Sequence, residues 1–439
     1  MSRKEYQAVV FAAGSGSRMS ELCTDIPKCL LPVANLPLFW YPLAYLDKNG
    51  IKDVILIVPK KCSSDLKRLL TEQCPKLSLT IDFVELTTDQ LDEWATADAL
   101  RYIADKIRTD FIVMSGDFIS DFPLHNLLNL HRAKQSALTC LLAEGATNGP
   151  IPGPKVKRSK DRDLIALDRK TNRILFLGAE DDFEDVVTLP PQLLNKYQQI
   201  DLTSKYRDCH LYVMKKWAID VLKAQSDSQM SSIKADLVPH LIERQYLGLS
   251  PEIASLVQRD QLSNLANSLS FNGRESGAGD IDCFALVVTA ADGYVVSRTN
   301  NLGAYFEINK AVVRILPKLL PEGLLVSSAP KPQGHIGGDC RVGDSVSCGE
   351  KAQVKRSIIG NHCSIGAKAK IVNSVVMDNV TIGAGASISN TILCHSSTIG
   401  DNADVKDSIV AIKQCVDTEE KLAAELVESE DASVMDIDE

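Results

Sequence analysis

An apolar residue recurs through the last quarter of the chain at intervals of six, six and five residues. The cycle runs over fourteen positions, and all of them are apolar: Ile336, Val342, Cys348, Val354, Ile359, Ile365, Ile371, Val376, Ile382, Ile388, Leu393, Ile399, Val405 and Val410. Because 45% of the residues are apolar, chance gives such a run about once in a hundred thousand trials. Three steps make one coil of 17 residues. The pattern therefore predicts a three-sided parallel β-helix with one apolar side chain per face pointing inward.

This repeat resembles the left-handed hexapeptide-repeat domains, and a glycine often follows the marked residue, where a tight corner favours one. We place the β-helix at 333–416. Residues 417–439 hold ten acidic residues and one basic residue, and we expect them to form a disordered acidic tail. Some hexapeptide-repeat proteins are acyltransferases that use a histidine. His362 and His395 lie in the repeat, but we interpret them as solvated corner residues, since the fold alone does not fix a function.

A second motif lies near the start of the chain, where an apolar run ends in a loop of small residues. The loop comprises Gly14, Ser15, Gly16, Ser17 and Arg18, and Pro27-Lys28 follows it. Consecutive backbone N–H groups in such a loop can surround a phosphate, while an arginine and a lysine supply positive charge. A Gly-x-Gly alone is a weak signal, because glycine loops after strands are often only turns. With the added Arg18 and Lys28, the motif predicts a nucleotide-handling site.

The motif resembles the signature of the sugar-1-phosphate nucleotidyltransferases, in which this loop and lysine grip a nucleoside triphosphate. Asp117, after an apolar strand, is then the lone candidate for a magnesium ligand; a simple turn beside Gly116 explains it equally well. The family's Gly-Thr-Ala segment stands here as Ala95-Thr96-Ala97, and its Glu-Lys-Pro segment is replaced by 176–180. Asp220 and Asp236 are weak candidates for the family's second metal ligand. The resemblance therefore implies a site that has lost its sugar-phosphate grip.

Strands and helices alternate from Tyr6 to about Glu243, which favours a doubly wound, mostly parallel α/β sheet with ligands at the carboxyl ends of its strands. We assign 1–282 to this nucleotidyltransferase-like domain. We assign 283–332 to a connection made of a hairpin over 284–297 and a helix over 309–320. Two further stretches, 148–163 and 261–282, have the composition of exposed loops.

Charge and cysteine content narrow the class of protein. Without 417–439, the chain holds 47 basic and 47 acidic residues, so no bias toward nucleic acid or membrane is implied. The twelve cysteines are scattered singly, which is typical of buried thiols in a reducing compartment. No apolar run has the length of a signal peptide core or a transmembrane span. We therefore expect a cytosolic protein without cofactors, direct nucleic-acid contacts or membrane contacts.

Several further segments, together spanning most of the chain, narrow the resemblance. They are Pro27–Val33 with Trp40–Leu43, Thr96–Ile103, His210–Lys216, Ser231–Lys234 and Val354–Gly360. Together they resemble the family of gamma subunits of eukaryotic translation initiation factor 2B. The resemblance implies a non-catalytic, stimulatory and structural subunit of the complex that exchanges GDP for GTP on initiation factor 2.

Its implied partners are the epsilon subunit, the remaining subunits of that complex and initiation factor 2. In this family the epsilon subunit carries an additional C-terminal helical domain for exchange, and the acidic tail is too short and too charged to form one. The glycine loop and Lys28 would then be vestigial nucleotide contacts. The alternative function is an active sugar-1-phosphate nucleotidyltransferase of the GDP-mannose type.

Overall fold

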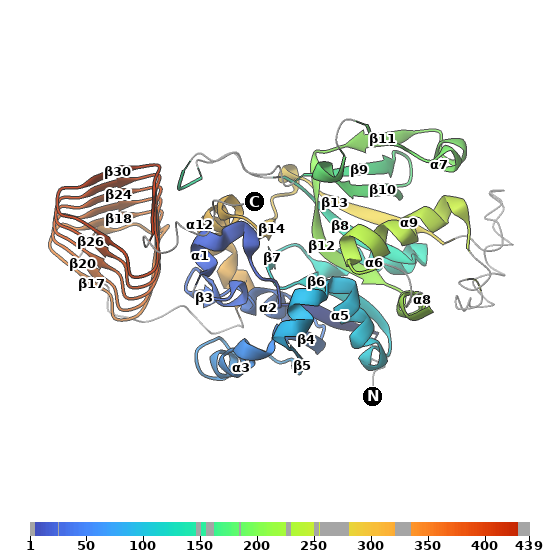
Figure 1. The fold of residues 1–439 in the computed structure, drawn as a ribbon, viewed down its shortest axis with the longest axis horizontal. Helices are drawn as coiled ribbons and strands as arrows, with labels where there is room; N and C mark the ends of the chain where they lie inside the picture. The colour runs from blue at the N-terminus through green and yellow to red at the C-terminus, as the bar shows by residue number, and fades with distance from the viewer. Residues whose placement is uncertain are drawn as a thin grey trace.

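The computed structural model describes residues 5–24, 26–145, 151–154, 162–183, 186–224, 230–249, 254, 281–320 and 335–428. They form an α/β domain and a separate stack of coils, which lies at one end of the long axis (Figure 1). The predicted loops 148–163 and 261–282 lie for the most part outside the described residues, as do residues 429–439 of the predicted tail.

The α/β domain is built on a seven-stranded sheet in the order β13-β8-β12-β6-β1-β4-β5. Its strands are β1 (Tyr6–Phe11), β4 (Asp53–Pro59), β5 (Thr80–Leu86), β6 (Asp110–Ser115), β8 (Leu138–Glu144), β12 (Tyr206–Met214) and β13 (Cys283–Val288). Only β12 runs antiparallel to its neighbours β6 and β8, and the other pairs are parallel. The predicted mostly parallel sheet is confirmed.

Helices cover both faces of this sheet, as the alternating side chains of β1 require. Val9 packs into one buried cluster with α5 (Thr96–Tyr102), α8 (Trp217–Ala224) and α9 (Val238–Leu247). Val10 packs into the other with α2 (Trp40–Lys48), α3 (Ser63–Glu72) and α6 (Leu124–Lys134). The two layers position the carboxyl ends of the strands at one edge of the domain.

Smaller elements complete the domain. A side sheet is formed by β10 (Ile174–Ala179), β9 (Asp163–Asp168) and β11 (Ile200–Thr203), with α7 (Pro191–Lys196) beside it. Further short elements include α1 (Ser20–Cys23), α4 (Thr88–Glu93), β2 (Pro32–Val33), β3 (Leu36–Pro37) and the π-helical turn η6 (Ile233–Leu237). None of the helices among the described residues is long and apolar enough to cross a membrane.

The hairpin predicted over 284–297 is wrong. β13 instead joins the edge of the main sheet parallel to β8, while β14 (Val296–Arg298) pairs antiparallel with β7 (Phe118–Ser120). An apolar strand such as 284–288 gains more by completing a sheet buried on both faces than by pairing with its exposed neighbour. The α/β domain therefore extends past residue 282.

The predicted helix over 309–320 begins earlier than expected. Helix α12 spans Leu302–Leu319, and the Asn301 side chain caps it by accepting a hydrogen bond from the N–H of Ala304 at 2.8 Å. An N-cap asparagine satisfies one of the free N–H groups of the first turn. The first half of α12 is buried against α2 and β2, so it belongs to the α/β domain as well.

The coils after residue 334 form the predicted β-helix, with three sheets of parallel strands around one core. The first sheet, the charged face, contains β15 (His335–Ile336), β18 (Gln353–Lys355), β21 (Lys370–Val372), β24 (Ser387–Ser389), β27 (Asp404–Lys406) and β30 (Lys421–Ala423). The second, the docked face, contains β16 (Arg341–Val342), β19 (Ile358–Ile359), β22 (Val375–Val376), β25 (Ile392–Leu393), β28 (Ile409–Val410) and β31 (Leu426–Val427). The third contains β17 (Ser347–Cys348), β20 (Ser364–Ile365), β23 (Thr381–Ile382), β26 (Thr398–Ile399) and β29 (Cys415–Val416).

The β-helix extends beyond the predicted end at residue 416. The cycle of six, six and five continues from Val410 to Val416, Leu422 and Val427, which lie in β29, β30 and β31. Leu422 is buried in the common core, although its neighbours Glu420 and Lys421 are exposed. The prediction ended the β-helix too early because it took the charged residues after 416 as a tail. Outward positions in a coil tolerate charge, and only the inward positions follow the apolar pattern.

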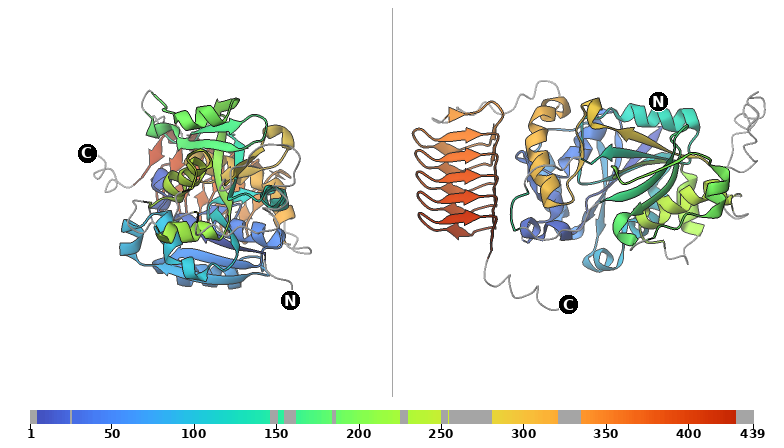
Figure 2. Two further views of the ribbon diagram at one scale, coloured as in Figure 1. Left: turned by 90° about the vertical axis from the view of Figure 1, so that its right-hand side faces the viewer. Right: turned by 90° about the horizontal axis from the view of Figure 1, so that it is seen from above.

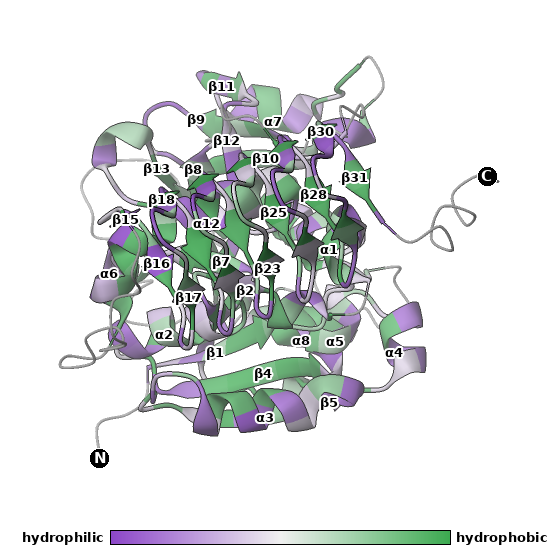
Figure 3. Cartoon of the chain, turned by 90° about the vertical axis from the view of Figure 1, so that its left-hand side faces the viewer, coloured by the Kyte–Doolittle hydropathy of each residue, from purple (hydrophilic) through white to green (hydrophobic). Residues whose placement is uncertain are grey.

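The docked face packs against the α/β domain through a column of outward apolar residues spaced one coil apart. Ile358, Val375, Ile392 and Ile409 are all buried, in one cluster with Tyr305, Ile308 and Val312 of α12. The Asn35 side-chain N–H₂ also donates to the carbonyl of Ile359 at 2.7 Å. Figure 2 shows the coils stacked beside α12, and Figure 3 shows this end of the molecule coloured by hydropathy.

Candidate functional site

The glycine loop and Asp117 meet at the carboxyl edge of the main sheet. Phe11, the last residue of β1, pairs with Ser115, the last residue of β6. The N–H of Gly116 donates to the carbonyl of Phe11 at 2.7 Å, and a Cβ at residue 116 would lie 2.6 Å from the same oxygen. Glycine is required here because the two strand ends approach so closely. The two predicted parts of the site therefore lie side by side.

The loop itself is folded down onto its own chain. Gly16 has a φ of 82°, and a Cβ there would lie 2.8 Å from Sγ of Cys23 and 3.2 Å from Cβ of Lys28. The other predicted loop residues, Gly14, Ser15, Ser17 and Arg18, are exposed. The side chain of Cys23 and the stem of Lys28 thus occupy the inner side of the loop.

The fold brings Lys28 and Asp117 together, and they form an ion pair with each other. Nζ of Lys28 lies 2.5 Å from Oδ2 of Asp117, whose side chain is 4% exposed. Nε of Arg298 lies 3.3 Å from Oδ1, and the Ser115 hydroxyl donates to the same oxygen at 2.6 Å. Burial alone would raise the pKa of Asp117, but Arg298 and Lys28 outweigh it and hold that pKa far below its usual range. The carboxylate is ionised and neutralised by two cations.

Sequence reasoning missed Arg298. The residue ends β14, and its pairing with Phe118 of β7 places it directly beside Asp117. A strand of three residues carries too little pattern to show which strand it joins. Without that pairing, nothing in the sequence connects residue 298 to residue 117.

The space left between loop and carboxylate is small. A cavity of about 40 Å³ is lined by Phe11, Ala12, Gly14, Lys28, Cys29, Leu38 and 115–117. That volume holds a few water molecules, whereas pockets for ligands of nucleotide size measure about 300–1,000 Å³. Among the described residues, no cluster of three or more histidine, cysteine, aspartate or glutamate side chains could hold a metal ion.

The segments expected near the base and the sugar phosphate make contacts of their own. The Thr96 hydroxyl accepts the N–H of Ile233 at 2.9 Å, and the N–H of Ala97 donates to Ser231 at 2.7 Å. At the place of the Glu-Lys-Pro segment, a Cβ on Gly178 would lie 2.8 Å from the ring of Phe183.

Neither weak candidate for a second metal ligand stands beside Asp117. The Asp236 carboxylate accepts the backbone N–H groups of Ser231 and Ser232 at 2.9 and 2.7 Å. Asp220 lies in the first turn of α8. The partners given above for Asp117 are Lys28, Arg298 and Ser115.

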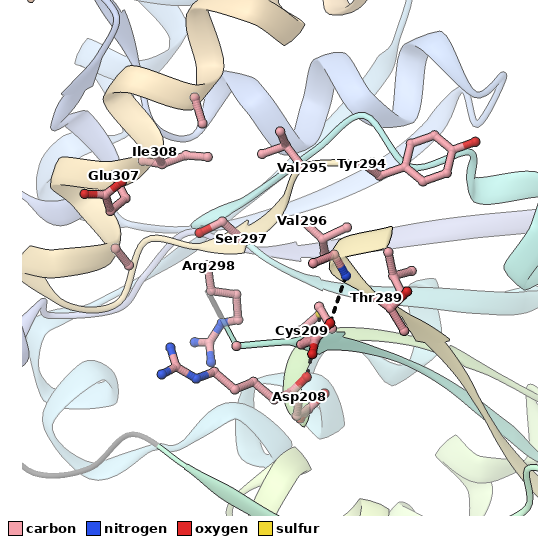
Figure 4. Close-up of a pocket in the computed structure, with 18 of the residues that line it drawn as sticks. Asp208, Cys209, Thr289, Tyr294, Val295, Val296, Ser297, Arg298, Glu307 and Ile308 are labelled. Atoms are coloured by element: carbon pink, nitrogen blue, oxygen red, sulfur yellow. Dashed lines mark hydrogen bonds between the residues drawn. The ribbon is translucent and has the colours of Figure 1, made fainter. Parts of the chain in front are cut away.

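A second, larger cavity lies on the other side of Arg298, with a volume of about 580 Å³ (Figure 4). It is lined by the ends of β8, β12 and β13, by β14 and by one stripe of α12: Ala304, Glu307, Ile308, Ala311 and Arg314. Tyr294, Val295, Val296 and Ile308 give it an apolar side, and Asp208 and Arg298 lie on the opposite side (Figure 4). This cavity shares no lining residue with the small one.

A buried polar network that includes Asp208, Asp163 and Lys234 lies along the wall of this cavity. The Tyr212 hydroxyl donates to Asp208, and Asp163 accepts both the N–H of Asp208 at 2.8 Å and Nζ of Lys234 at 2.6 Å. Burial raises the pKa of Asp208. The side chains of Asp208, Asp163 and Lys234 are therefore satisfied by protein partners, whereas Nε2 of the neighbouring His210 is buried with no hydrogen-bond partner among the described residues.

The cysteines carry no second site. All twelve thiols are free, and eight are buried. Burial raises the pKa of most of them, as in Cys29, where it reaches about 12. Such thiols are protonated at neutral pH and behave as small apolar side chains.

Comparisons with known proteins assign both parts of the chain. The nucleotidyl transferase family matches residues 7–149, and the EIF2B subunit epsilon LbH domain matches residues 329–422. Translation initiation factor eIF2B subunit gamma from Caenorhabditis elegans is 34% identical over 361 residues, covering 81% of this chain and 80% of the relative. The gamma subunit from Schizosaccharomyces pombe is 32% identical, covering 80% and 74%.

The epsilon subunit of the same factor is a more distant relative. The Schizosaccharomyces pombe protein is 25% identical over 215 residues, covering 47% of this chain and 30% of that subunit. Similarity to the gamma subunits extends over both the α/β domain and the β-helix. Identities of 34% and 32% over about four fifths of the chain show common family membership. The chain therefore belongs to the family of translation initiation factor eIF2B gamma subunits.

Proposed function

We propose that the chain is a stimulatory and structural subunit of the complex that exchanges GDP for GTP on translation initiation factor 2. In this proposal the epsilon subunit performs the exchange, and this chain supports it without catalysing exchange or nucleotidyl transfer itself. Its likeness to the gamma subunits along most of its length is the observation that carries the proposal. The epsilon subunit and the remaining subunits are its proposed partners, and the cytosol is its proposed location.

The arrangement of Lys28, Arg298 and Asp117 beside the glycine loop supports the proposal that the chain does not catalyse nucleotidyl transfer. Such a reaction needs a metal ion held by carboxylates, with free cationic groups on the phosphates. Here Lys28 and Arg298 both lie against Asp117. A divalent cation approaching that carboxylate would meet two positive charges. We propose that Gly14–Arg18 and Lys28 are remnants of a nucleotide site, and that Lys28 and Asp117 now serve the stability of the domain.

We expect no pyrophosphate release when the purified chain is mixed with magnesium, each nucleoside triphosphate and a panel of sugar 1-phosphates. The reason is that Lys28 is paired with Asp117, and that no cluster of three or more histidine, cysteine, aspartate or glutamate side chains among the described residues could hold a metal ion. A sugar-1-phosphate nucleotidyltransferase of known activity, assayed in parallel, controls for the reagents. Turnover above the blank with any pair, GTP with mannose 1-phosphate above all, would establish the alternative function and contradict the proposal.

We expect the chain to co-purify with the epsilon subunit and to raise the rate at which that subunit releases labelled GDP from initiation factor 2. The chain without the epsilon subunit should leave that release at its spontaneous rate. The measurement is the fluorescence decay of a labelled GDP on initiation factor 2, with the epsilon subunit alone as the reference. An unchanged rate on adding the chain, or a chain that stays monomeric beside the epsilon subunit, argues against the proposal.

A further inference from the structure

The charged face of the β-helix carries its charge in a graded order along the stack of coils. Five windows of seven residues, one per coil, cover β18, β21, β24, β27 and β30, though not β15, with the two corners beside each strand: 350–356, 367–373, 384–390, 401–407 and 418–424. The first two windows each hold two more basic than acidic residues. The third holds no charge, and the last two hold an acidic excess of two and one.

The residues of this gradient are named as follows. The basic residues are Lys351, Lys355, Arg356, Lys368 and Lys370 at one end, with Lys406 and Lys421 at the other. The acidic residues are Glu350 at the first end and Asp401, Asp404, Asp407, Glu419 and Glu420 at the other. Figure 1 labels β18, β24 and β30, which mark the basic end, the middle and the acidic end.

The basic end is open to solvent. All five of its lysine and arginine side chains are exposed, and no ion pair joins them to an acid within the described part of the chain. The segment 151–154 contacts the stack at one corner of this face, where the N–H of Gly153 donates to the carbonyl of Asp407 at 2.7 Å. In β24 the outward strand positions are the small, half-buried residues Ser387 and Ser389.

The order of charges along the charged face is complementary to the same order in a second copy whose stack runs in the opposite direction. If a second copy is turned by half a turn about an axis along β24, its acidic coils lie opposite the basic coils of the first copy. The uncharged rows with Ser387 and Ser389 then meet in the middle, where small side chains allow two flat sheets to approach. A parallel arrangement about the stack axis would instead place the basic coils opposite each other.

We propose that the charged face binds the same face of a second copy in an antiparallel, two-fold symmetric arrangement. The five rows span about 19 Å along the stack at a strand spacing of about 4.8 Å, so the contact is smaller than a standard interface. Exposed ion pairs contribute at most about 1 kcal/mol each and are screened by salt. The expected dimer is therefore weak and forms at low ionic strength. This proposal concerns the chain by itself and does not depend on the proposed function.

Sedimentation velocity of the full chain over a range of concentrations tests the proposal. We expect dimers at low salt that dissociate at high salt. The double variant Lys351→Glu with Lys355→Glu, in the β18 row, and the double variant Glu419→Lys with Glu420→Lys, in the β30 row opposite it, should each be monomeric. An equimolar mixture of the two variants should dimerise again, because each then supplies the charges that the other lacks. The matched control is Lys413→Glu, an exposed charge reversal at a corner outside the charged face.

Two results would overturn the proposal. One is a parent chain that stays monomeric at low salt; the other is a mixture that sediments like the separate variants. Binding to the epsilon subunit is measured on the same variants. If those variants still bind it while the parent chain never dimerises, the self-pairing is wrong and the proposed function stands. If the parent chain dimerises at low salt but does not bind the epsilon subunit, the self-pairing stands and the proposed function is wrong.

Discussion

Replacing Arg298 by alanine is expected to lower the free energy of unfolding by roughly 3 kcal/mol, because it leaves the charge of Asp117 buried with one cation fewer. Both side chains of this pair are largely inaccessible, at 18% and 4% exposure. The depressed pKa of Asp117 shows how strongly the site favours the ionised form. Urea unfolding followed by circular dichroism measures the change, with the midpoint and slope compared with those of the parent chain.

The control for this prediction is Arg169→Ala, which removes an arginine from an exposed ion pair. Nε of Arg169 lies 3.1 Å from Asp201, and the two side chains are 71% and 48% exposed. Such pairs contribute little, so its midpoint should stay close to that of the parent. Adding Asp117→Asn to Arg298→Ala should deepen the loss, since Lys28 is then left beside the site without its counter-charge. Equal effects of Arg298→Ala and Arg169→Ala would show that the pair contributes nothing.

Placing aspartate at position 382 is expected to destabilise the β-helix by about 4 kcal/mol or more. Ile382 is 2% exposed and packs inside the stack with Ile365 and Ile399 above and below it. An ionised carboxylate there would have no partner and no water. Thermal unfolding measures the loss, and co-purification with the epsilon subunit should weaken at the same time.

The neighbouring residue supplies a matched control in the same strand. Thr381 is exposed on the outer side of β23, so Thr381→Asp introduces the same charge one residue away on the opposite side of the sheet. Its unfolding temperature should stay near that of the parent. If Ile382→Asp is tolerated equally well, residue 382 does not face the interior of the coil.

The sequence predicted those parts of the fold in which a short local pattern repeats. One inward residue per face was sufficient to identify the β-helix, and the same cycle would have extended it to Val427 had the acidic residues not been taken as its end. The outward column Ile358, Val375, Ile392 and Ile409 has the same 17-residue period. That column contains the signal for docking on α12, although the inward positions alone were counted.

Long-range pairing accounts for what the sequence did not predict. β13 and β14 are adjacent in the chain but join different sheets, and their residues give no sign of which partner each one has. The choice depends on which sheet edge the rest of the domain leaves open. Arg298 reaches Asp117 only because β14 pairs with β7. The sequence therefore predicted which residues form the loop site, but it could not predict that Arg298 and Lys28 neutralise Asp117.

The column of outward apolar residues on the docked face would allow the β-helix to gain whole coils of 17 residues. Four successive coils present an aliphatic residue to α12 at the equivalent position, so sliding the stack by one whole coil would place most of these contacts on one another. Two contacts break this degeneracy: the Asn35 amide on Ile359, and the backbone N–H of Gly153 on Asp407. Whole-coil insertions beyond these anchor points would lengthen the stack without disturbing the contacts between the docked face and α12.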